Sequence, residues 1–243
     1  METGKREIQD KRIDLKNRKK KRLKKLIYWL IIDLSVAFII ISLLLYKPGN
    51  YEPIVNDPDF SESSDVSSYL TELTSYIYNN AQLNKPFEVE VTQEALNDMI
   101  TKADWPKESQ GVMLYAPAAI INNNLVVFMG TAVFQGVEFI ITIEIEPKIK
   151  EDNSLLLDLK TVKIGVMNIT PLAKLTAQKM YAEKLSEIAD SNNYEYNLQS
   201  KIIASLLSEE PFEPVFEIEN DKIRINKINI EQGKFTVFLI PEK

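Results

Sequence analysis

The chain contains no cysteine and no histidine among its 243 residues, and it has only seven glycines. Without these side chains it can form no disulfide, no Cys/His zinc site, and neither a Ser-His-Asp nor a Cys-His catalytic group. The glycines are not gathered into a loop of the kind that cradles phosphate. Carboxylates, hydroxyls, lysines and tyrosines are the groups left for any catalysis. The sequence predicts no cofactor and no metal site.

The net charge of -6 (29 basic minus 35 acidic residues) combines two regions of opposite sign. Residues 1–25 hold twelve Lys/Arg and four Asp/Glu, which gives +8 (12 minus 4). Residues 47–243 hold seventeen Lys/Arg and thirty Asp/Glu, which gives -13 (17 minus 30). The basic segment directly precedes a long apolar run. We therefore interpret it as a topology and lipid-contact signal and expect no nucleic-acid partner.

Residues 26–46 form a run of 21 mostly apolar residues with Asp33 as its one charge. At about 1.5 Å per residue, a helix of this length spans roughly 30 Å, the thickness of a hydrocarbon core. Because positive charge resists translocation, we expect residues 1–25 in the cytoplasm and the C-terminal bulk outside. A cleaved signal peptide is the alternative, but its apolar core would be shorter and followed by small residues. The sequence favours an uncleaved, single-pass signal anchor.

Asp33 lies eight residues into this run, nearer its cytoplasmic side. A charge at the centre of a bilayer costs about 2.5–3.5 kcal/mol on insertion scales, and the cost falls toward the interface. Two interpretations stay open. The side chain is either tolerated at this depth or meets a partner helix.

Residues 47–65 contain three prolines and a Ser/Asp cluster without apolar periodicity, which predicts an extended linker. Asp57 and Asp59 lie in it, but the spacing of a calcium-binding loop is missing. An extracytoplasmic domain is then expected over residues 66–243. Apolar residues at helical spacing predict four helices in this domain. They span residues 66–82, 93–103, 171–190 and 198–208.

Alternating apolar residues between short turn signals predict strands elsewhere in the domain. They span residues 87–91, 112–121, 125–134, 137–146, 155–166, 215–219, 222–230 and 235–240. The apolar parity changes near Lys160 and Thr161, which predicts a bulge there. Consecutive strands joined by short turns favour antiparallel pairing. The fold class expected is α+β, with a mostly antiparallel, curved sheet and packed helices.

The strands carry more apolar faces than one thin layer needs. Residues 125–134 are apolar at both parities, and the strands beside them each have one fully apolar side. This surplus indicates either an ordinary core or an elongated apolar groove that binds a ligand. The groove would be lined by Val127, Met129, Phe139, Ile141, Ile143, Leu157 and Leu159.

A few polar residues suggest other chemistry. Glu108 lies in a polar loop, where a wall-cleaving enzyme would place an acid, although a solvated loop residue is the simpler interpretation. Glu144 and Glu146 share one strand face and would bind a cation or simply face water. Residues 168–170 (Asn-Ile-Thr) fit the glycosylation pattern, but the Pro171 that follows favours a helix-capping role.

Two stretches resemble the YpmS-like family, membrane-anchored proteins of low-GC Gram-positive bacteria. They are residues 87–100 (FEVEVTQEALNDMI), a strand followed by a helix, and residues 155–165 (LLLDLKTVKIG), a strand ending in Gly. The likeness covers roughly residues 86–243, and the chain departs from the family in its long basic N-terminus and longer linker. Similarity of the family to tubular lipid-binding domains implies a lipid-handling role outside the membrane. The residues that carry the match are Phe87, Leu96, Asn97 and Gly165.

Three functional hypotheses follow. The first is a non-catalytic, membrane-anchored domain that binds lipid or a lipid-linked envelope molecule. The second is a module that assembles with other envelope proteins, suggested by Asp33 and by the acidic outer region. The third is a carboxylate-dependent cell-wall enzyme with Glu108 as its candidate acid.

Overall fold

The computed structural model describes residues 3–53, 67–103, 105–109, 111–188, 194–218 and 221–242. The chain divides into two compact units, Met1–Leu44 and Leu45–Lys243. The first unit is helix α1 (Thr3–Leu44). Its segment Lys24–Leu44 has the length and hydropathy of a membrane-crossing helix, and a signal sequence near an N-terminus has the same properties. Residues 24–43 of this segment, Asp33 among them, are exposed.

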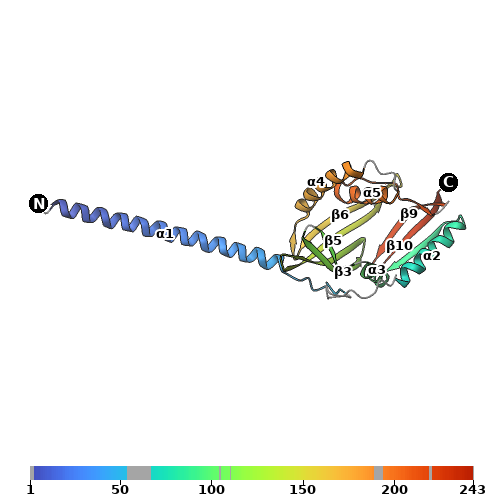
Figure 1. The fold of residues 1–243 in the computed structure, drawn as a ribbon, viewed down its shortest axis with the longest axis horizontal. Helices are drawn as coiled ribbons and strands as arrows, with labels where there is room; N and C mark the ends of the chain where they lie inside the picture. The colour runs from blue at the N-terminus through green and yellow to red at the C-terminus, as the bar shows by residue number, and fades with distance from the viewer. Residues whose placement is uncertain are drawn as a thin grey trace. The chain divides into compact units, whose positions relative to one another are not determined.

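The second unit contains two antiparallel sheets, which Figure 1 shows with their covering helices. This confirms the expected α+β class. Sheet A has the order β1-β10-β9-β8, built from β1 (Phe87–Thr92), β8 (Val215–Ile218), β9 (Asp221–Glu231) and β10 (Lys234–Glu242). Sheet B has the order β2-β3-β4-β5-β6-β7. Its strands are β2 (Lys107–Ser109), β3 (Val112–Asn122), β4 (Leu125–Phe134), β5 (Val137–Ile149), β6 (Leu155–Ile164) and β7 (Met167–Asn168). The helices are α2 (Ser68–Gln82), α3 (Gln93–Thr101), α4 (Thr170–Ile188) and α5 (Tyr194–Ser208).

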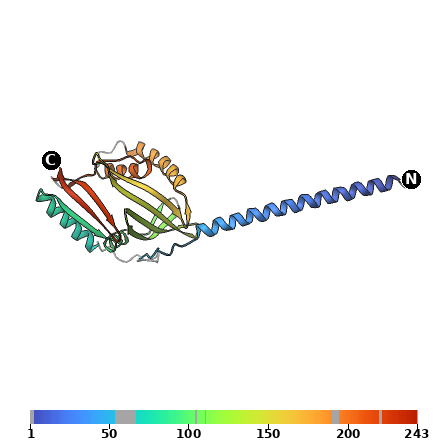
Figure 2. The same cartoon turned by 180° about the vertical axis from the view of Figure 1, so that it is seen from behind.

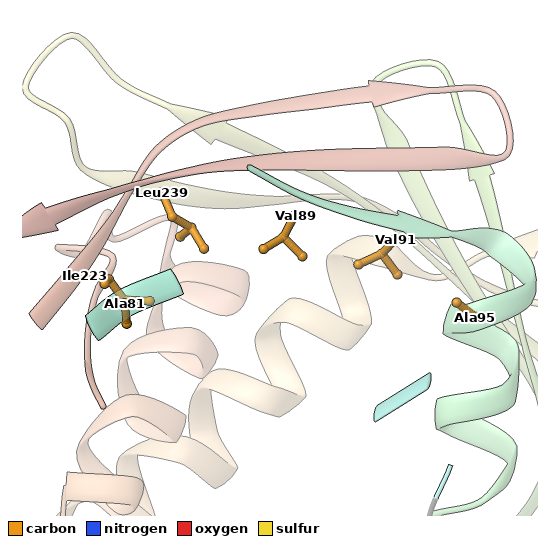
Figure 3. Close-up of a cluster of buried hydrophobic side chains, with 6 residues drawn as sticks. All are labelled: Ala81, Val89, Val91, Ala95, Ile223 and Leu239. Atoms are coloured by element: carbon orange, nitrogen blue, oxygen red, sulfur yellow. The ribbon is translucent and has the colours of Figure 1, made fainter. Parts of the chain in front are cut away.

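The apolar face of sheet A forms a sealed core with α2 and α3. Figure 3 shows side chains from β1, β9 and β10 lying on one side of the sheet together with Ala81 of α2 and Ala95 of α3. All six are buried, because the two helices cover the strands along their length. The six residues are Ala81, Val89, Val91, Ala95, Ile223 and Leu239.

The edge of sheet B at β3 is closed by side-chain amides from α3. Asn97 Nδ2 donates to the carbonyl of Ala119 at 2.8 Å, and Asn97 Oδ1 accepts from the N–H of the same residue at 2.7 Å. Gln93 Oε1 accepts from Ile121 N at 2.9 Å, while the Ile121 carbonyl accepts from Gly233 N, also at 2.9 Å. An unpaired strand edge is a template for pairing with another chain. Here α3 and the β9–β10 turn satisfy it and join the two sheets.

The opposite edge, at β6, is also satisfied by residues outside the sheet. Ser205 of α5 is fully buried, and its hydroxyl accepts from Leu157 N at 2.8 Å. Phe212 forms a β-bridge with Leu155. The hydroxyl of Thr170 accepts from Val162 N at 2.8 Å and bonds to Asn168 Oδ1. The Asn-Ile-Thr stretch therefore has a structural role at the start of α4, as its helix-start signal indicates.

Tyr51, which the sequence placed in the linker of residues 47–65, is part of the fold. Its ring is 4 % exposed and packs on Ala118, Val127, Met129 and Ile140. Its hydroxyl donates to the carbonyl of Ala116 at 2.6 Å and bonds to Thr131 Oγ1 at 2.8 Å. Residues 54–66, with Asp57 and Asp59, lie outside the described part of the chain.

Two bulges shape sheet B. The pairing of β3 with β4 shifts between Tyr115 and Ala118, where Ala116 has a positive φ and Pro117 cannot donate to a ladder. This turns the Ala116 carbonyl toward Tyr51. The pairing of β5 with β6 shifts so that Lys160 has no direct partner, which confirms the bulge predicted near it.

Candidate functional site

The pairing register assigns the side chains of sheet B to two faces. Directly paired residues of adjacent strands lie on the same face. Ile143 pairs with Phe128 on one side and with Val162 on the other. Phe128 also packs against the core where the two sheets meet, so this face, the inner face, is continuous with the core of sheet A. The other face, the outer face, contains Glu144 with its partner Val127.

The residues predicted to line a groove divide between these faces. Val127 and Met129 lie on the outer face and are buried beneath Tyr51. The remaining five belong to the inner face: Phe139, Ile141, Ile143, Leu157 and Leu159. Strand β4 is apolar at both parities, and side chains alternate between faces with a period of two. The sequence therefore gave no sign of which β4 residues would share a face with Ile143.

The inner face is apolar yet stays accessible along its central strand. Phe139, Ile141, Ile143 and Ile145 of β5 are each half-buried. On the same strand Ile140 and Thr142, which point to the outer face, are buried at 8 % and 6 % exposure. The sequence predicted that one side of this strand faces apolar matter and the other faces water, and the structure differs at Ile140 and Thr142. Tyr51 is the reason, because it covers the outer face at the middle of β4 and β5.

Helices α4 and α5 explain the uneven burial of the inner face. Both contact β6, and Leu155, Leu159 and Val162 of that strand are buried there. Strand β5 lies one place further from these helices in the sheet and keeps its inner side chains half-buried. Figure 2 shows the two helices from the opposite side, at the edge of sheet B where β6 lies. The result is an apolar strip along β5, beside the helix-covered β6.

The strip carries no charged or polar side chain. Positions 128, 139, 141, 143, 145 and 157 are Phe, Phe, Ile, Ile, Ile and Leu. From Phe139 to Ile145 the chain advances six residues, or roughly 20 Å at about 3.4 Å per residue. That exceeds half of the ~30 Å hydrocarbon core, the part filled by the chains of one leaflet. The strip therefore has the polarity and length to contact an acyl chain.

The outer face of β5 and β6 is charged and internally paired. Lys163 Nζ lies 2.7 Å from Glu144, and Lys148 and Lys160 lie 2.7 and 2.9 Å from Glu146. Hydrogen bonds from both lysines lower the pKa of Glu146. Burial raises the pKa of Glu144, but the hydrogen bonds from Lys163 and Thr161 outweigh it and the net shift is downward. Both carboxylates are paired with lysines, which gives no support to the hypothesis that they bind a cation.

Asp158 and Tyr115 complete this set of polar contacts. Asp158 accepts from Lys160 at 2.6 Å and from Lys148 at 3.1 Å, and the hydrogen bond from Lys160 is the main cause of its lowered pKa. Tyr115 donates to Glu138 at 2.9 Å, and burial together with this bond raises the pKa of Tyr115 to about 12. In the described residues no group of three or more acidic side chains is placed to hold a metal ion.

Glu108, the candidate catalytic acid, is exposed on strand β2, where it pairs with Met113. It lies on an edge strand of sheet B. A general acid usually needs a site that raises its pKa through burial or a nearby carboxylate. Glu108 is exposed, so its position gives the enzyme hypothesis no support.

Comparison with protein-family models and with curated proteins gives no match to this chain. The resemblance to the YpmS-like family stays a prediction. Two of the residues that carry it have clear structural roles. Asn97 caps the β3 edge through both atoms of its amide, and Gly165 adopts a φ of 58° in the β6–β7 turn. Both roles concern the fold and assign no ligand.

Proposed function

We propose that the chain is held in the membrane by an uncleaved α1, with the basic segment in the cytoplasm and the second unit outside. We further propose that the second unit binds an acyl chain of a lipid or lipid-linked molecule, without catalysis, on the inner face of sheet B. The observation that carries the proposal is the half-buried, wholly apolar strip on β5. Apolar surface of this length is rarely left accessible unless a ligand or partner covers it.

The strip is apolar and already formed in the absence of a ligand, as a binding site for an acyl chain should be. Small-molecule sites are mostly apolar and largely formed before the ligand arrives. Sheet B is held on both edges, by Asn97 and Gln93 at β3 and by Ser205 and Thr170 at β6, so the strip does not need to be built on binding. A bound chain would cover Ile141 and Ile143 and gain roughly 25 cal/mol for each Å² removed from water.

Photocrosslinking in the full chain tests this proposal. Phe139 is replaced by photoreactive benzoylphenylalanine, and the protein is irradiated in nanodiscs of phosphatidylglycerol and phosphatidylethanolamine whose acyl chains carry an alkyne. Phe238 serves as the matched control, since it is a half-buried aromatic residue on the opposite side of sheet A from the core. Phe38, in α1, is the positive control for membrane insertion. We expect lipid adducts at Phe139 and Phe38 and not at Phe238.

A second variant separates binding from accidental contact with the bilayer. Ile143→Glu places a carboxylate midway along the strip, and burying a charge against hydrocarbon is strongly unfavourable. The Phe139 adduct should fall by about tenfold or more, equivalent to at least ~1.4 kcal/mol of lost affinity. Ile143→Val should leave it unchanged. Equal adducts in Ile143→Glu and the parent, or equal adducts at Phe139 and Phe238, would overturn the proposal.

A further inference from the structure

Five of the exposed apolar side chains of the second unit lie at one end of sheet B, here termed the apolar end. Phe134 and Val137 flank the β4–β5 turn and pair directly with each other. Gly165 N donates to the Ile140 carbonyl at 2.8 Å, which brings the β6–β7 turn and its Val166 to the same end of β5. The residues of the apolar end are Phe134, Val137, Val166, Leu172 and Leu175, with 45, 43, 42, 62 and 53 % exposure.

Leu172 and Leu175 reach this end because α4 begins there. Strand β7 pairs with the last residues of β6, and Thr170 then fixes the first residue of α4 to Val162. Leu172 and Leu175 are three residues apart in the first turns of the helix, so they share one of its faces. The hydrogen bonds of Thr170 hold the start of α4, which carries both leucines, beside the end of β6.

The apolar end also lacks charge in an otherwise acidic region. Residues 125–137 and 164–173 contain no Asp, Glu, Lys or Arg, although residues 47–243 carry a net -13. The nearest charged side chains already have partners. Glu138 accepts from Tyr115, and Lys174 lies 2.7 Å from Glu209. An uncharged apolar surface of this kind suits the boundary between lipid headgroups and acyl chains.

A short stretch of chain connects the apolar helix to the first buried residue of the second unit, Tyr51. Tyr51 N donates to the Pro48 carbonyl, which closes a turn that spans less than about 7 Å. The four residue steps from Leu44, the last residue of α1, to Pro48 reach at most about 15 Å. Tyr51 is therefore within about 22 Å of the end of the apolar helix, and its hydroxyl is hydrogen-bonded to Thr131. Thr131 precedes Phe134 on β4 by three residues, or roughly 10 Å.

We propose that the apolar end inserts its five side chains into the outer surface of the membrane that α1 crosses. The partner is the lipid surface itself. The inference rests on the anchored topology proposed above, but it does not depend on a ligand in the strip. Docking would also give lipid a route to the apolar strip, because Phe134 and Val137 belong both to the apolar end and to the inner face. A docked domain would present the start of the strip to the bilayer, so that an acyl chain could pass from lipid to Ile141 with little exposure to water.

Single-cysteine labelling tests the docking, since the chain has no cysteine of its own. Leu172→Cys is labelled with an environment-sensitive nitrobenzoxadiazole dye in the full chain, in nanodiscs that contain phosphatidylcholine spin-labelled on its acyl chain. Leu83→Cys is the matched control, with 63 % exposure against 62 % for Leu172, and it follows α2 beside sheet A. Phe38→Cys reports that α1 is inserted.

We expect the spin label to quench the dye at Leu172 about twofold or more relative to Leu83, because interfacial side chains lie about 5–10 Å into the headgroup and acyl boundary. Adding Val137→Glu and Val166→Glu should abolish that difference while leaving quenching at Phe38 unchanged. Equal quenching at Leu172 and Leu83, with Phe38 quenched, would overturn the docking. Lipid adducts at Phe139 would then still support the proposed ligand site, so the two proposals fail separately.

Discussion

Sheets A and B carry apolar faces of similar composition, and these faces meet where Ile121 and Val126 contact Ile230. On sheet A the helices α2 and α3 cover the apolar face, and Val89, Ile223 and Leu239 are buried. On sheet B the helices α4 and α5 contact β6, and the apolar side chains of β5 stay half-buried. The comparison teaches that an apolar strand face becomes a core only where another element lies over it.

The largest expected effect contrasts one residue type in the two sheets. Ile223→Ala should destabilise the domain by about 2–5 kcal/mol, because it leaves a cavity in a sealed core. Ile143→Ala should cost about 1 kcal/mol, since its side chain is already partly exposed and loses less buried area. Denaturant unfolding of the full chain in detergent, followed by Trp105 fluorescence in a Trp29→Phe background, measures both. Equal losses would mean that the inner face of sheet B is as closed as that of sheet A.

The second largest loss of stability is expected at Asn97, which joins the two sheets through α3. Asn97→Asp keeps the acceptor for Ala119 N but removes the donor to the Ala119 carbonyl, so that a buried backbone group loses its partner. We expect a loss of about 1–3 kcal/mol in the same unfolding assay. Asn80→Asp, whose amide donates to the Tyr76 carbonyl in an exposed hydrogen bond of α2, is the control and should change stability by less than about 0.5 kcal/mol. A loss for Asn97→Asp no greater than for the control would show that α3 does not join the sheets.

Tyr51 tests why the outer face of sheet B is buried in its middle. Tyr51→Phe keeps the ring but removes the bonds to Ala116 and Thr131, which should cost about 1–2 kcal/mol. Tyr69→Phe, at a 47 % exposed position, should be close to neutral. The same variant should also increase hydrogen exchange at Thr131 and Ile140. Unchanged exchange at both residues would count against Tyr51 as the cover of this face.

The smallest effect concerns the charged half of the outer face. The pKa values of Glu146 and Asp158 are lower in the folded state than in the unfolded chain. The two ionised carboxylates therefore stabilise the fold at pH values above the carboxyl pKa of the unfolded chain, near pH 4. This stabilisation is lost as the pH falls through the pKa values of the folded state. Because their lysine partners are more than a third exposed, solvent screening keeps the contribution of each pair small. Unfolding midpoints measured from neutral to acidic pH should show this loss. The double variant Glu146→Gln/Asp158→Asn should flatten it, and an unflattened profile would assign the acid sensitivity to other carboxylates.

Much of the fold was predictable because its signals are local. The strand boundaries around residues 122–124 and 135–136 follow from turn residues, and the bulge at Lys160 follows from a change of apolar parity. Strand β2 was missed, since Lys107–Ser109 has no apolar alternation and exists only through its pairing with β3. The burial of Tyr51 was missed as well, because its flanking prolines and glycine indicate a linker and its partners lie 65 and 80 residues away.

The sequence by itself determined the charge division, the apolar helix predicted at residues 26–46, the α+β class and the lack of any Cys or His chemistry. Each of these depends on composition or on patterns within a few residues, which need no knowledge of distant neighbours. Tertiary structure alone decided that Val127 and Ile143 point to opposite faces, that Tyr51 covers one face and that the other stays open. Those outcomes depend on strand register and on which elements lie over each face, and contacts between residues far apart in the chain set both.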